Sequence, residues 1–350
     1  MSDMTKHAAL RPMRPAGLSV SRASRASTIT MVLCVVIVLG LVAAPWWAGR
    51  ADLRLMGEMF LYLSLAVLWN LLAGYAGLVS VGQQAFVGFG GYMLFALTML
   101  WGVPPLAAIA LSGVIGAVVA MPVAALIFRL RGAYFAIGTW VVAEVFRLVA
   151  AQIGALGGGS GTSLSPQIVK ALADGRAARE ALTFWLALTL AVGVIAAVFW
   201  LLRSRHGLAL TAIRDNELAS KSLGIDIWRT KFLTYVVVGG LTTLTGSLIF
   251  LQKIRISPEA AFSANDWTAF VIFIVVIGGI GTLEGPILGT LIFFALRETL
   301  ADLGTIYLII LGVLAIAIMV RAPRGLWGLV SEKTGVDLFP LSRRVRGLDR

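Results

Sequence analysis

Long apolar runs separated by short polar connections dominate this sequence of 350 residues. Most of these runs approach the roughly 20 residues that a helix needs to cross a bilayer core of about 30 Å. They lie at 29–48, 55–73, 79–100, 106–128, 133–151, 183–202, 232–251, 267–280, 287–301 and 306–320. The pattern therefore predicts an all-α, polytopic transmembrane helix bundle of about ten spans.

Two of the runs are expected to be short or broken helices. The run at 267–280 is short for a bilayer, and a cluster of helix-breaking residues separates it from the next run: Gly278, Gly279, Gly281, Gly285 and Pro286. Such interruptions are typical of discontinuous helices in transporters.

The first run, 29–48, has two interpretations. It ends in Trp46 and Trp47, which suit the aromatic belt at a membrane interface. A cleaved signal peptide or an organellar presequence is the alternative. The length of the run and Pro45, directly after Val42-Ala43-Ala44, favour a membrane span.

Composition and charge agree with a membrane protein and give it an orientation. Hydrophobic residues make up 59% of the chain and charged residues 13%, where a soluble domain has about a quarter charged. Of the 29 Lys and Arg residues, 20 lie in segments predicted to be cytoplasmic and seven in segments predicted to be external. The positive-inside rule therefore places both termini in the cytoplasm, and it explains the net charge of +12 without nucleic acid.

The resulting organisation is a transmembrane domain between two basic tails. The cytoplasmic N-terminal tail covers 1–28, the transmembrane domain 29–321 and the cytoplasmic C-terminal tail 322–350. Within the domain, an external loop is expected at about 152–182 and a cytoplasmic loop at about 203–231. The expected location is the cytoplasmic (inner) membrane of a bacterium, with lipid around the spans.

Residues suited to catalysis or metal binding are scarce. Cys34 is the one cysteine, and the two histidines, His7 and His206, cannot form a cluster of metal ligands or a convincing catalytic triad. The glycine-rich stretch 157–161 suggests a phosphate-binding loop, but no Lys-Ser/Thr follows it, and a flexible connection is the better interpretation. We expect no catalytic residues, no bound metal and no enzymatic activity.

A glycine-rich turn joins the second and third runs and leads into a helix face of small residues. Gln84, Gly88 and Gly91 share this face by their spacing. A small face with one amide could line a passage through the membrane. It is equally typical of a closely packed helix interface.

The fifth run contains two ionisable residues. Glu144 and Arg147 lie three residues apart and can pair on one helix. Charges inside a span usually face the bundle interior or a water-filled cavity, which makes the pair a candidate functional site. A structural ion pair that fixes the helix register is the alternative.

The cytoplasmic segment 206–231 is predicted to contain a short exposed helix. Glu217 precedes Lys221 by four residues, a favourable helix pair, and Gly224 is placed to end the helix. Such an element is suited to docking a soluble partner. A solvated loop that sets topology is the alternative.

Five motifs in order resemble the membrane subunits of branched-chain amino acid ABC importers, most closely the LivM-type permease family. The first is 74–92, and the second is Gly132-Ala133-Tyr134-Phe135-Ala136-Ile137 with Glu144 and Arg147. The others are 212–224, 278–289 and 323–329. Departures occur at Gln83-Gln84, where many members have His-Ala or Gln-Ala, and at 157–161, which replaces a Thr-Gly-Gly pattern.

The resemblance implies a function and its partners. The chain would form half of a translocation pathway by pairing with a second, LivH-type permease, with two cytoplasmic ATP-binding subunits and an external solute-binding protein. ATP would bind those subunits, and no cofactor is expected on this chain. The solute would be a branched-chain or related amino acid; urea, short amides and small aromatic or carboxylic acids use similar-looking permeases. A secondary transporter is a further alternative.

The resemblance also suggests roles for individual residues. The candidates for the solute pathway are Gln83, Gln84, Gly88, Gly91, Glu144 and Arg147. The candidates for coupling to the ATPase are Ala212, Arg214, Asp215, Asn216, Glu217, Ala219 and Gly224.

Overall fold

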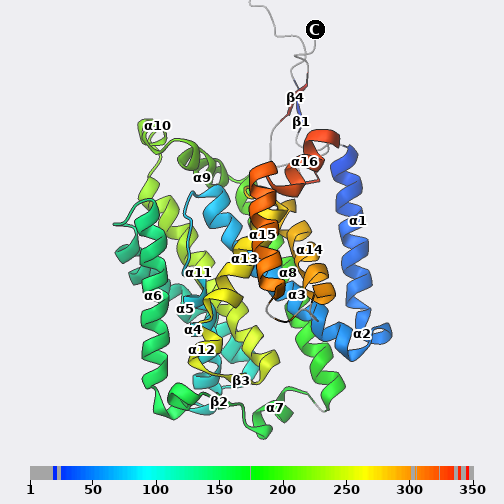
Figure 1. The fold of residues 1–350 in the computed structure, drawn as a ribbon, viewed down its shortest axis with the longest axis vertical. Coiled ribbons are helices and arrows are strands. Elements are labelled where there is room, and N and C mark those ends of the chain that lie inside the picture. The colour runs from blue at the N-terminus through cyan, green and yellow to red at the C-terminus, as the bar shows by residue number, and fades with distance from the viewer. Residues whose placement is uncertain are drawn as a thin grey trace, which may run out of the picture.

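A computed structural model describes residues 19–21, 25–173, 175–300, 304, 306–322, 324–334, 338–339 and 344–346. Helices form nearly all of this part of the chain and stand side by side as a bundle (Figure 1). They are α1 Arg25–Val42, α2 Ala44–Trp47, α3 Arg50–Asn70, α4 Gln83–Met99, α5 Pro105–Ile127, α6 Ala133–Gln152, α7 Pro166–Leu172, α8 Arg176–Arg203, α9 Arg205–Asp215, α10 Glu217–Ser222, α11 Ile227–Lys253, α12 Pro258–Ala261, α13 Phe270–Gly278, α14 Glu284–Leu300, α15 Ile306–Arg321 and α16 Gly325–Thr334.

Short irregular elements modify the helix ends. The π-helical turn η1 Leu71–Tyr75 continues α3, and η4 Asn265–Ala269 precedes α13. Two 3-10 turns, η2 Gly154–Leu156 and η3 Gly158–Ser160, follow α6.

Two small antiparallel strand pairs tie distant segments together. The strand β1 Ser19–Ser21 pairs with β4 Arg344–Arg346, and β2 Thr162–Ser163 pairs with β3 Arg255–Ile256. The first pair brings both tails to one end of the bundle, the end that also carries α9 and α10 (Figure 1). Most of the predicted tail 1–28 and part of the predicted tail 322–350 lie outside the described residues.

The predicted membrane bundle is confirmed. Seven helical segments in the described part are long and apolar enough to cross a bilayer: Arg50–Tyr75, Pro105–Ile127, Ala133–Gln152, Arg176–Arg203, Ile227–Lys253, Pro258–Gly278 and Ile306–Lys333. The other three predicted spans correspond to α1, α4 and α14, which are shorter or less apolar than these seven segments. Each of the ten predicted runs thus coincides over most of its length with a helix of the described part.

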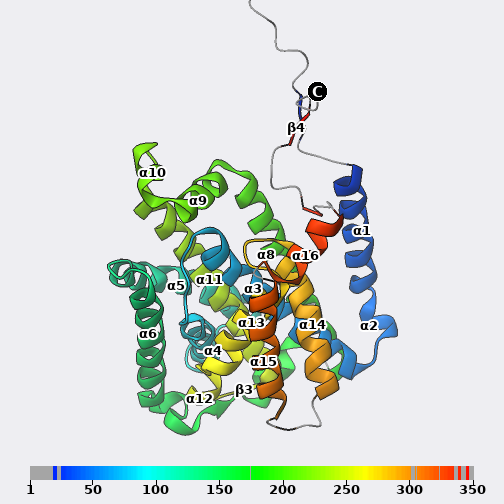
Figure 2. The same ribbon diagram turned by 45° about the horizontal axis from the view of Figure 1, so that its top comes forward.

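The helices divide into a buried centre and an exposed periphery. In the most apolar stretch of α3 and of α11, 72% of the residues are buried, against 22% in α6. In both views α1 and α6 stand at opposite edges, with α3, α11 and α13 between them (Figures 1 and 2). A peripheral helix of this kind must meet lipid or another protein chain.

Glycine allows the central helices α4 and α11 to touch through their backbones. A Cβ atom on Gly90 would overlap the carbonyl oxygen of Thr243, and one on Gly246 would overlap that of Val87. In a membrane, close packing through small residues replaces the hydrophobic effect as the force that holds helices together.

The structure corrects several predicted boundaries. The span predicted at 29–48 ends at Val42, and the span predicted at 79–100 begins only at Gln83. The short run 267–280 gains length from α12 and η4, so the helical segment extends over Pro258–Gly278. The predicted C-terminal tail begins with the helix α16.

Candidate functional site

The helix α3 breaks inside the bundle, and the chain turns back before α4 begins. The last turn of α3 is the π-helical turn η1, and residues 76–82 that follow are not helical. Gly77 has a φ of +68° and allows the reversal. A Cβ atom on Gly82 would overlap the carbonyl oxygen of Thr139, so glycine lets the returning segment lie against α6.

Side chains of neighbouring helices form hydrogen bonds with the backbone of the returning segment, residues 76–82. The indole Nε1 of Trp69 donates to the carbonyl oxygen of Ser80 over 2.8 Å, and the amide of Val81 donates to Oγ1 of Thr139 over 3.0 Å. At membrane depth, irregular backbone is tolerated only where protein surrounds it in this way.

A second break, between α13 and α14, lies directly against the first. Asn70, at the end of α3, donates from Nδ2 to the carbonyl oxygen of Thr282 over 2.7 Å, and its Oδ1 accepts from the amide of Gly281 over 2.8 Å. A Cβ atom on Gly74 would lie 2.6 Å from the amide nitrogen of Gly281. One asparagine thus joins the two breaks.

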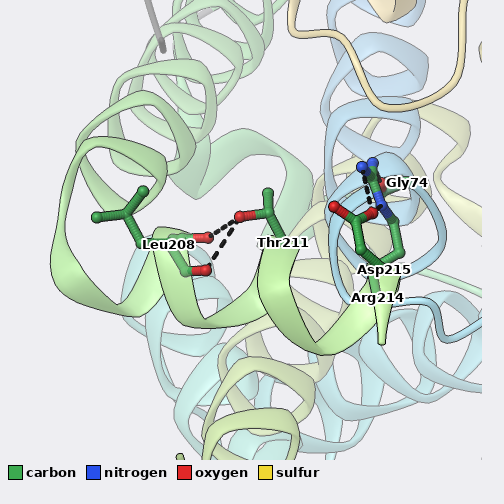
Figure 3. Close-up of polar contacts among 6 residues, drawn as sticks. Gly74, Leu208, Thr211, Arg214 and Asp215 are labelled. Carbon is green, nitrogen blue, oxygen red and sulfur yellow. Dashed lines mark hydrogen bonds and ion pairs between the residues drawn. The ribbon is translucent and has the colours of Figure 1, made fainter. Parts of the chain in front are cut away.

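The helix α9 reaches this junction through Arg214. Its Nη1 donates to the carbonyl oxygen of Gly74 over 2.6 Å, and its Nε donates to Oδ1 of Asp215 over 3.0 Å (Figure 3). A Cβ atom on Gly281 would lie 3.2 Å from the same Nη1. The last turn of α9 is therefore fastened to the break of α3 by one guanidinium group, which also lies close to the break between α13 and α14.

The predicted exposed helix is in fact two helices, which corrects the sequence interpretation. The chain is extended at Asn216, between α9 and α10. The side-chain Oδ1 of Asn216 caps α10 by accepting from the amide of Ala219 over 3.0 Å, while the amide of Asn216 donates to the carbonyl of Ala212 over 3.0 Å. A helix can thus end and a new one begin at a capping asparagine, without the proline or glycine that usually marks a helix boundary in a sequence.

The predicted partner of Glu217 is also corrected. Glu217 forms an ion pair with Lys231 at the start of α11, not with Lys221 on its own helix. Gly224 has the expected position just after α10, with a φ of +79°. The ion pair closes a loop from α10 back to α11.

Two exposed leucines on this element were missed by sequence reasoning. Leu218 is 82% exposed and Leu223 is 78% exposed, both in the α10 region beyond the bundle. In the sequence, these leucines could have been recognised as apolar residues at the two ends of a short, otherwise polar helix. Two largely exposed leucines on one short element leave apolar surface available for a protein contact.

The predicted face of α4 is filled within this chain. A Cβ atom on Gly88 would overlap the ring of Phe262, and one on Gly91 would overlap that of Phe250. The buried side chain of Gln84 accepts at Oε1 from the hydroxyl of Thr268. This geometry corresponds to the close-packed alternative for the face.

Gln83, next to this face, borders a small internal cavity. Its Nε2 donates to the carbonyl oxygen of Leu65 over 3.1 Å, while its Oε1 and the Oγ1 of Thr242 have no hydrogen-bond partner among the described residues. Both residues line a cavity of about 10 Å³, with Ser80 and Tyr235. The cavity is no larger than about one water molecule, so it is no passage for a solute.

Glu144 and Arg147 pair as predicted, but they lie on the outer face of α6. Arg147 donates from Nε to Glu144 over 3.0 Å, and their side chains are 31% and 47% exposed, respectively. Their neighbours on this face, including Trp140, Val145 and Leu148, are apolar and exposed. The structure thus brings the pair together and separates it from the buried Gln84 and Gly88.

Comparison with known proteins agrees with the resemblance. The chain is 28% identical over 323 residues to the high-affinity branched-chain amino acid transport system permease protein LivM of Escherichia coli (strain K12), covering 86% of this chain and 76% of the relative. It is 27% identical to LivM of Salmonella typhimurium (81% and 72%) and 27% identical to a probable branched-chain amino acid transport permease protein LivH of Methanocaldococcus jannaschii (41% and 45%). No solved structure matches the chain.

The family match covers most of the chain. The family described as branched-chain amino acid transport system / permease component matches residues 53–320, from α3 to the end of α15. Both helix breaks and the element α9–α10 lie within this range. The chain is therefore a multi-pass membrane protein that belongs to the branched-chain amino acid transport system / permease component family.

Proposed function

We propose that this chain is the membrane-spanning permease subunit of an ABC importer and forms half of a translocation pathway for branched-chain or related amino acids. Its family membership and the names of its LivM relatives support the substrate class. The chain has no Gly-x4-Gly-Lys sequence, so ATP binds separate subunits and the permease itself is not an enzyme.

The proposed assembly contains a second permease, two cytoplasmic ATPase subunits and an external solute-binding protein. The similarity to a LivH protein supports a partner from the same family. The end with α9 and α10 faces the cytoplasm, because 203–231 and both tails are rich in Lys and Arg. The opposite end, with the loop 152–182, faces outward across the inner membrane.

The observation that carries the coupling role is the connection between an exposed surface and the helix breaks. Leu218 and Leu223 present apolar surface at the proposed cytoplasmic end, while Arg214 fastens the same element to Gly74. A movement of a docked ATPase would therefore act directly on the end of α3 and, through Asn70, on the break between α13 and α14. Rigid helices that end at breaks can transmit such a movement as hinge rotation.

We expect the double variant Leu218→Ser, Leu223→Ser to lose most of its bound ATPase. Burying a leucine stabilises an interface by about 1.5–3 kcal/mol, and both side chains are free for that contact in this chain. The measurement is co-purification of the ATPase with the tagged permease, together with solute uptake by reconstituted vesicles.

The matched control is Leu130→Ser, an exposed leucine in the connection between α5 and α6 at the same end of the bundle. This variant should retain the ATPase and full uptake. Normal ATPase retention by the double variant would refute docking through α10.

We assign the outer face of α6 to the contact with the second permease. A charge at the centre of a membrane helix costs about 2.5–3.5 kcal/mol on insertion scales, so lipid is an unfavourable environment for Glu144 and Arg147. A protein interface or a water-filled pathway between the two permeases removes that cost. On this assignment Glu144 and Arg147 remain candidates for the solute pathway, whereas the predicted face of α4 is packed within the chain.

Glu144→Ala and Arg147→Ala are each expected to impair assembly of the permease pair, because either change leaves one charge without its partner. The double variant should be impaired less than the sum of the two single effects. Partner co-purification and uptake are the measurements. Arg324→Ala, which breaks the exposed ion pair with Glu332 on α16, is the control and should have little effect. Normal assembly and uptake by both single variants would exclude the assignment.

A further inference from the structure

A hollow of about 430 Å³ lies at the end of the bundle opposite α9 and α10. It is bordered by η3, the end of α11, β3 and α12, and Figure 1 shows β3 and α12 at that end. The lining includes Ser160, Lys253, Arg255, Ser257 and Glu259. Its volume is in the range typical of small-molecule sites, about 300–1,000 Å³.

Two cations that line the hollow form no ion pair among the described residues. Neither Lys253 nor Arg255 forms an ion pair within 4.0 Å among the described residues. The ammonium group of Lys253 lies over the ring of Trp267, 4.6 Å from its centroid. That contact holds the charge in place while leaving its hydrogen-bond donors for another group.

The position of these cations runs against the charge bias of the chain. They are two of the seven basic residues in segments predicted to be external, where the positive-inside rule disfavours Lys and Arg. Topology therefore gives no reason for them, whereas recognition of an anion does.

Glu259 supplies the opposite charge in the same hollow. It forms no ion pair within 4.0 Å among the described residues, and its helix α12 contacts α6, as does η3, which also lines the hollow. The hollow thus borders the helix that carries the Glu144–Arg147 pair.

The backbone around the hollow is held in a defined shape. The strand β2 pairs with β3, and a Cβ atom on Gly161 would overlap the carbonyl oxygen of Ile256. Ile254, between Lys253 and Arg255, has a φ of +59° and is the one non-glycine residue with positive φ in the described part. This conformation is strained for a β-branched residue, so tertiary contacts must maintain it.

The arrangement of two cations and one carboxylate points to an outer binding site for an α-amino acid zwitterion. The solute carboxylate would bind Lys253 and Arg255, and its ammonium group would bind Glu259. The inference rests on the proposed function and adds to it the place on this chain where the solute is first received. The side chain of the bound amino acid would extend toward the outer face of α6.

The test uses site-directed labelling at Ser160, which is exposed on the rim. Cys34 is the chain's one cysteine, so Cys34→Ala with Ser160→Cys leaves this chain with a single thiol, and its labelling is followed on the separated chain. The complete transporter is placed in right-side-out vesicles, and the rate of reaction with an impermeant maleimide is measured. We expect millimolar leucine to slow labelling severalfold, while leucinamide, without a carboxylate, and isovalerate, without an ammonium group, do not.

The variants Lys253→Gln, Arg255→Gln and Glu259→Gln should each abolish protection by leucine. Lys170→Gln, an exposed lysine of α7 outside the hollow, should retain it. Equal protection by isovalerate would overturn the role of Glu259, and protection only by a solute-binding protein would make the hollow a docking face instead.

A separate uptake measurement distinguishes this inference from the proposed function. Absence of protection together with normal ATP-dependent leucine uptake would overturn the outer site alone. Absence of uptake for branched-chain and related amino acids, in a correctly assembled transporter, would overturn the proposed function itself.

Discussion

Replacing Arg214 with glutamine is expected to separate ATP hydrolysis from transport. The guanidinium of Arg214 is the direct polar link from α9 to the carbonyl of Gly74 at the break of α3. A hydrogen bond to a charged group contributes about 1.5–3 kcal/mol, which corresponds to roughly a 10- to 150-fold change in an equilibrium or a rate. Uptake by reconstituted vesicles should fall by that order, while the ATPase remains bound, because the leucines of α10 are unchanged.

Arg205→Gln is the matched control for this prediction. It removes the same charge from the exposed start of the same helix, and it should leave uptake near the level of the parent protein. If Arg214→Gln transports normally, or if it loses the ATPase altogether, Arg214 does not transmit movement as proposed.

Replacing Gly90 with alanine should destabilise the bundle more than any conservative change on its surface. The added methyl group would overlap the carbonyl oxygen of Thr243, which belongs to the backbone of α11 and cannot rotate away. Overpacking of a tight contact costs about 1–3 kcal/mol, and a clash with backbone lies at the upper end of that range. Thermal unfolding followed by size-exclusion chromatography in detergent should show a lower transition temperature and a smaller yield.

Gly193→Ala tests whether the effect comes from packing or from glycine itself. Gly193 also lies inside a membrane helix, α8, but no atom lies within 4 Å of the position that its Cβ would take. Alanine there should be neutral or slightly stabilising, because it favours the helix. Equal loss of stability in both variants would contradict the proposed contact between α4 and α11.

The hydrophobic pattern predicted the membrane bundle and the approximate position of its helices, because burial in lipid requires an apolar run of a certain length. It did not predict that residues 79–82 leave the helix. The run 79–100 as a whole is apolar enough to form a span. The non-helical conformation of residues 79–82 is stabilised by hydrogen bonds with other helices, such as those of Trp69 with Ser80 and of Thr139 with Val81. Tertiary hydrogen bonds of this kind leave no periodic signal in a sequence.

The candidate site was predicted in parts but not as an assembly. The charged segment around Arg214 was visible, whereas its partner Gly74 lies 140 residues earlier in the chain. The pair of Glu217 with Lys231 replaced the local pair with Lys221, because the helix breaks at Asn216 and α10 folds back on α11. Local spacing rules describe a continuous helix and fail where a cap interrupts it.

The exposed ion pair on α6 also bears on the life of the subunit before assembly. On the proposed arrangement, a single copy of this chain in the bilayer presents Glu144 and Arg147 to lipid. The free-energy cost of exposing these charges to lipid is removed only when the partner permease covers them. Binding to the folded form stabilises a protein by mass action. The amount of intact subunit in the membrane would then follow the supply of the partner permease, so that balanced synthesis of the two chains, and not the stability of either alone, sets the number of transporters.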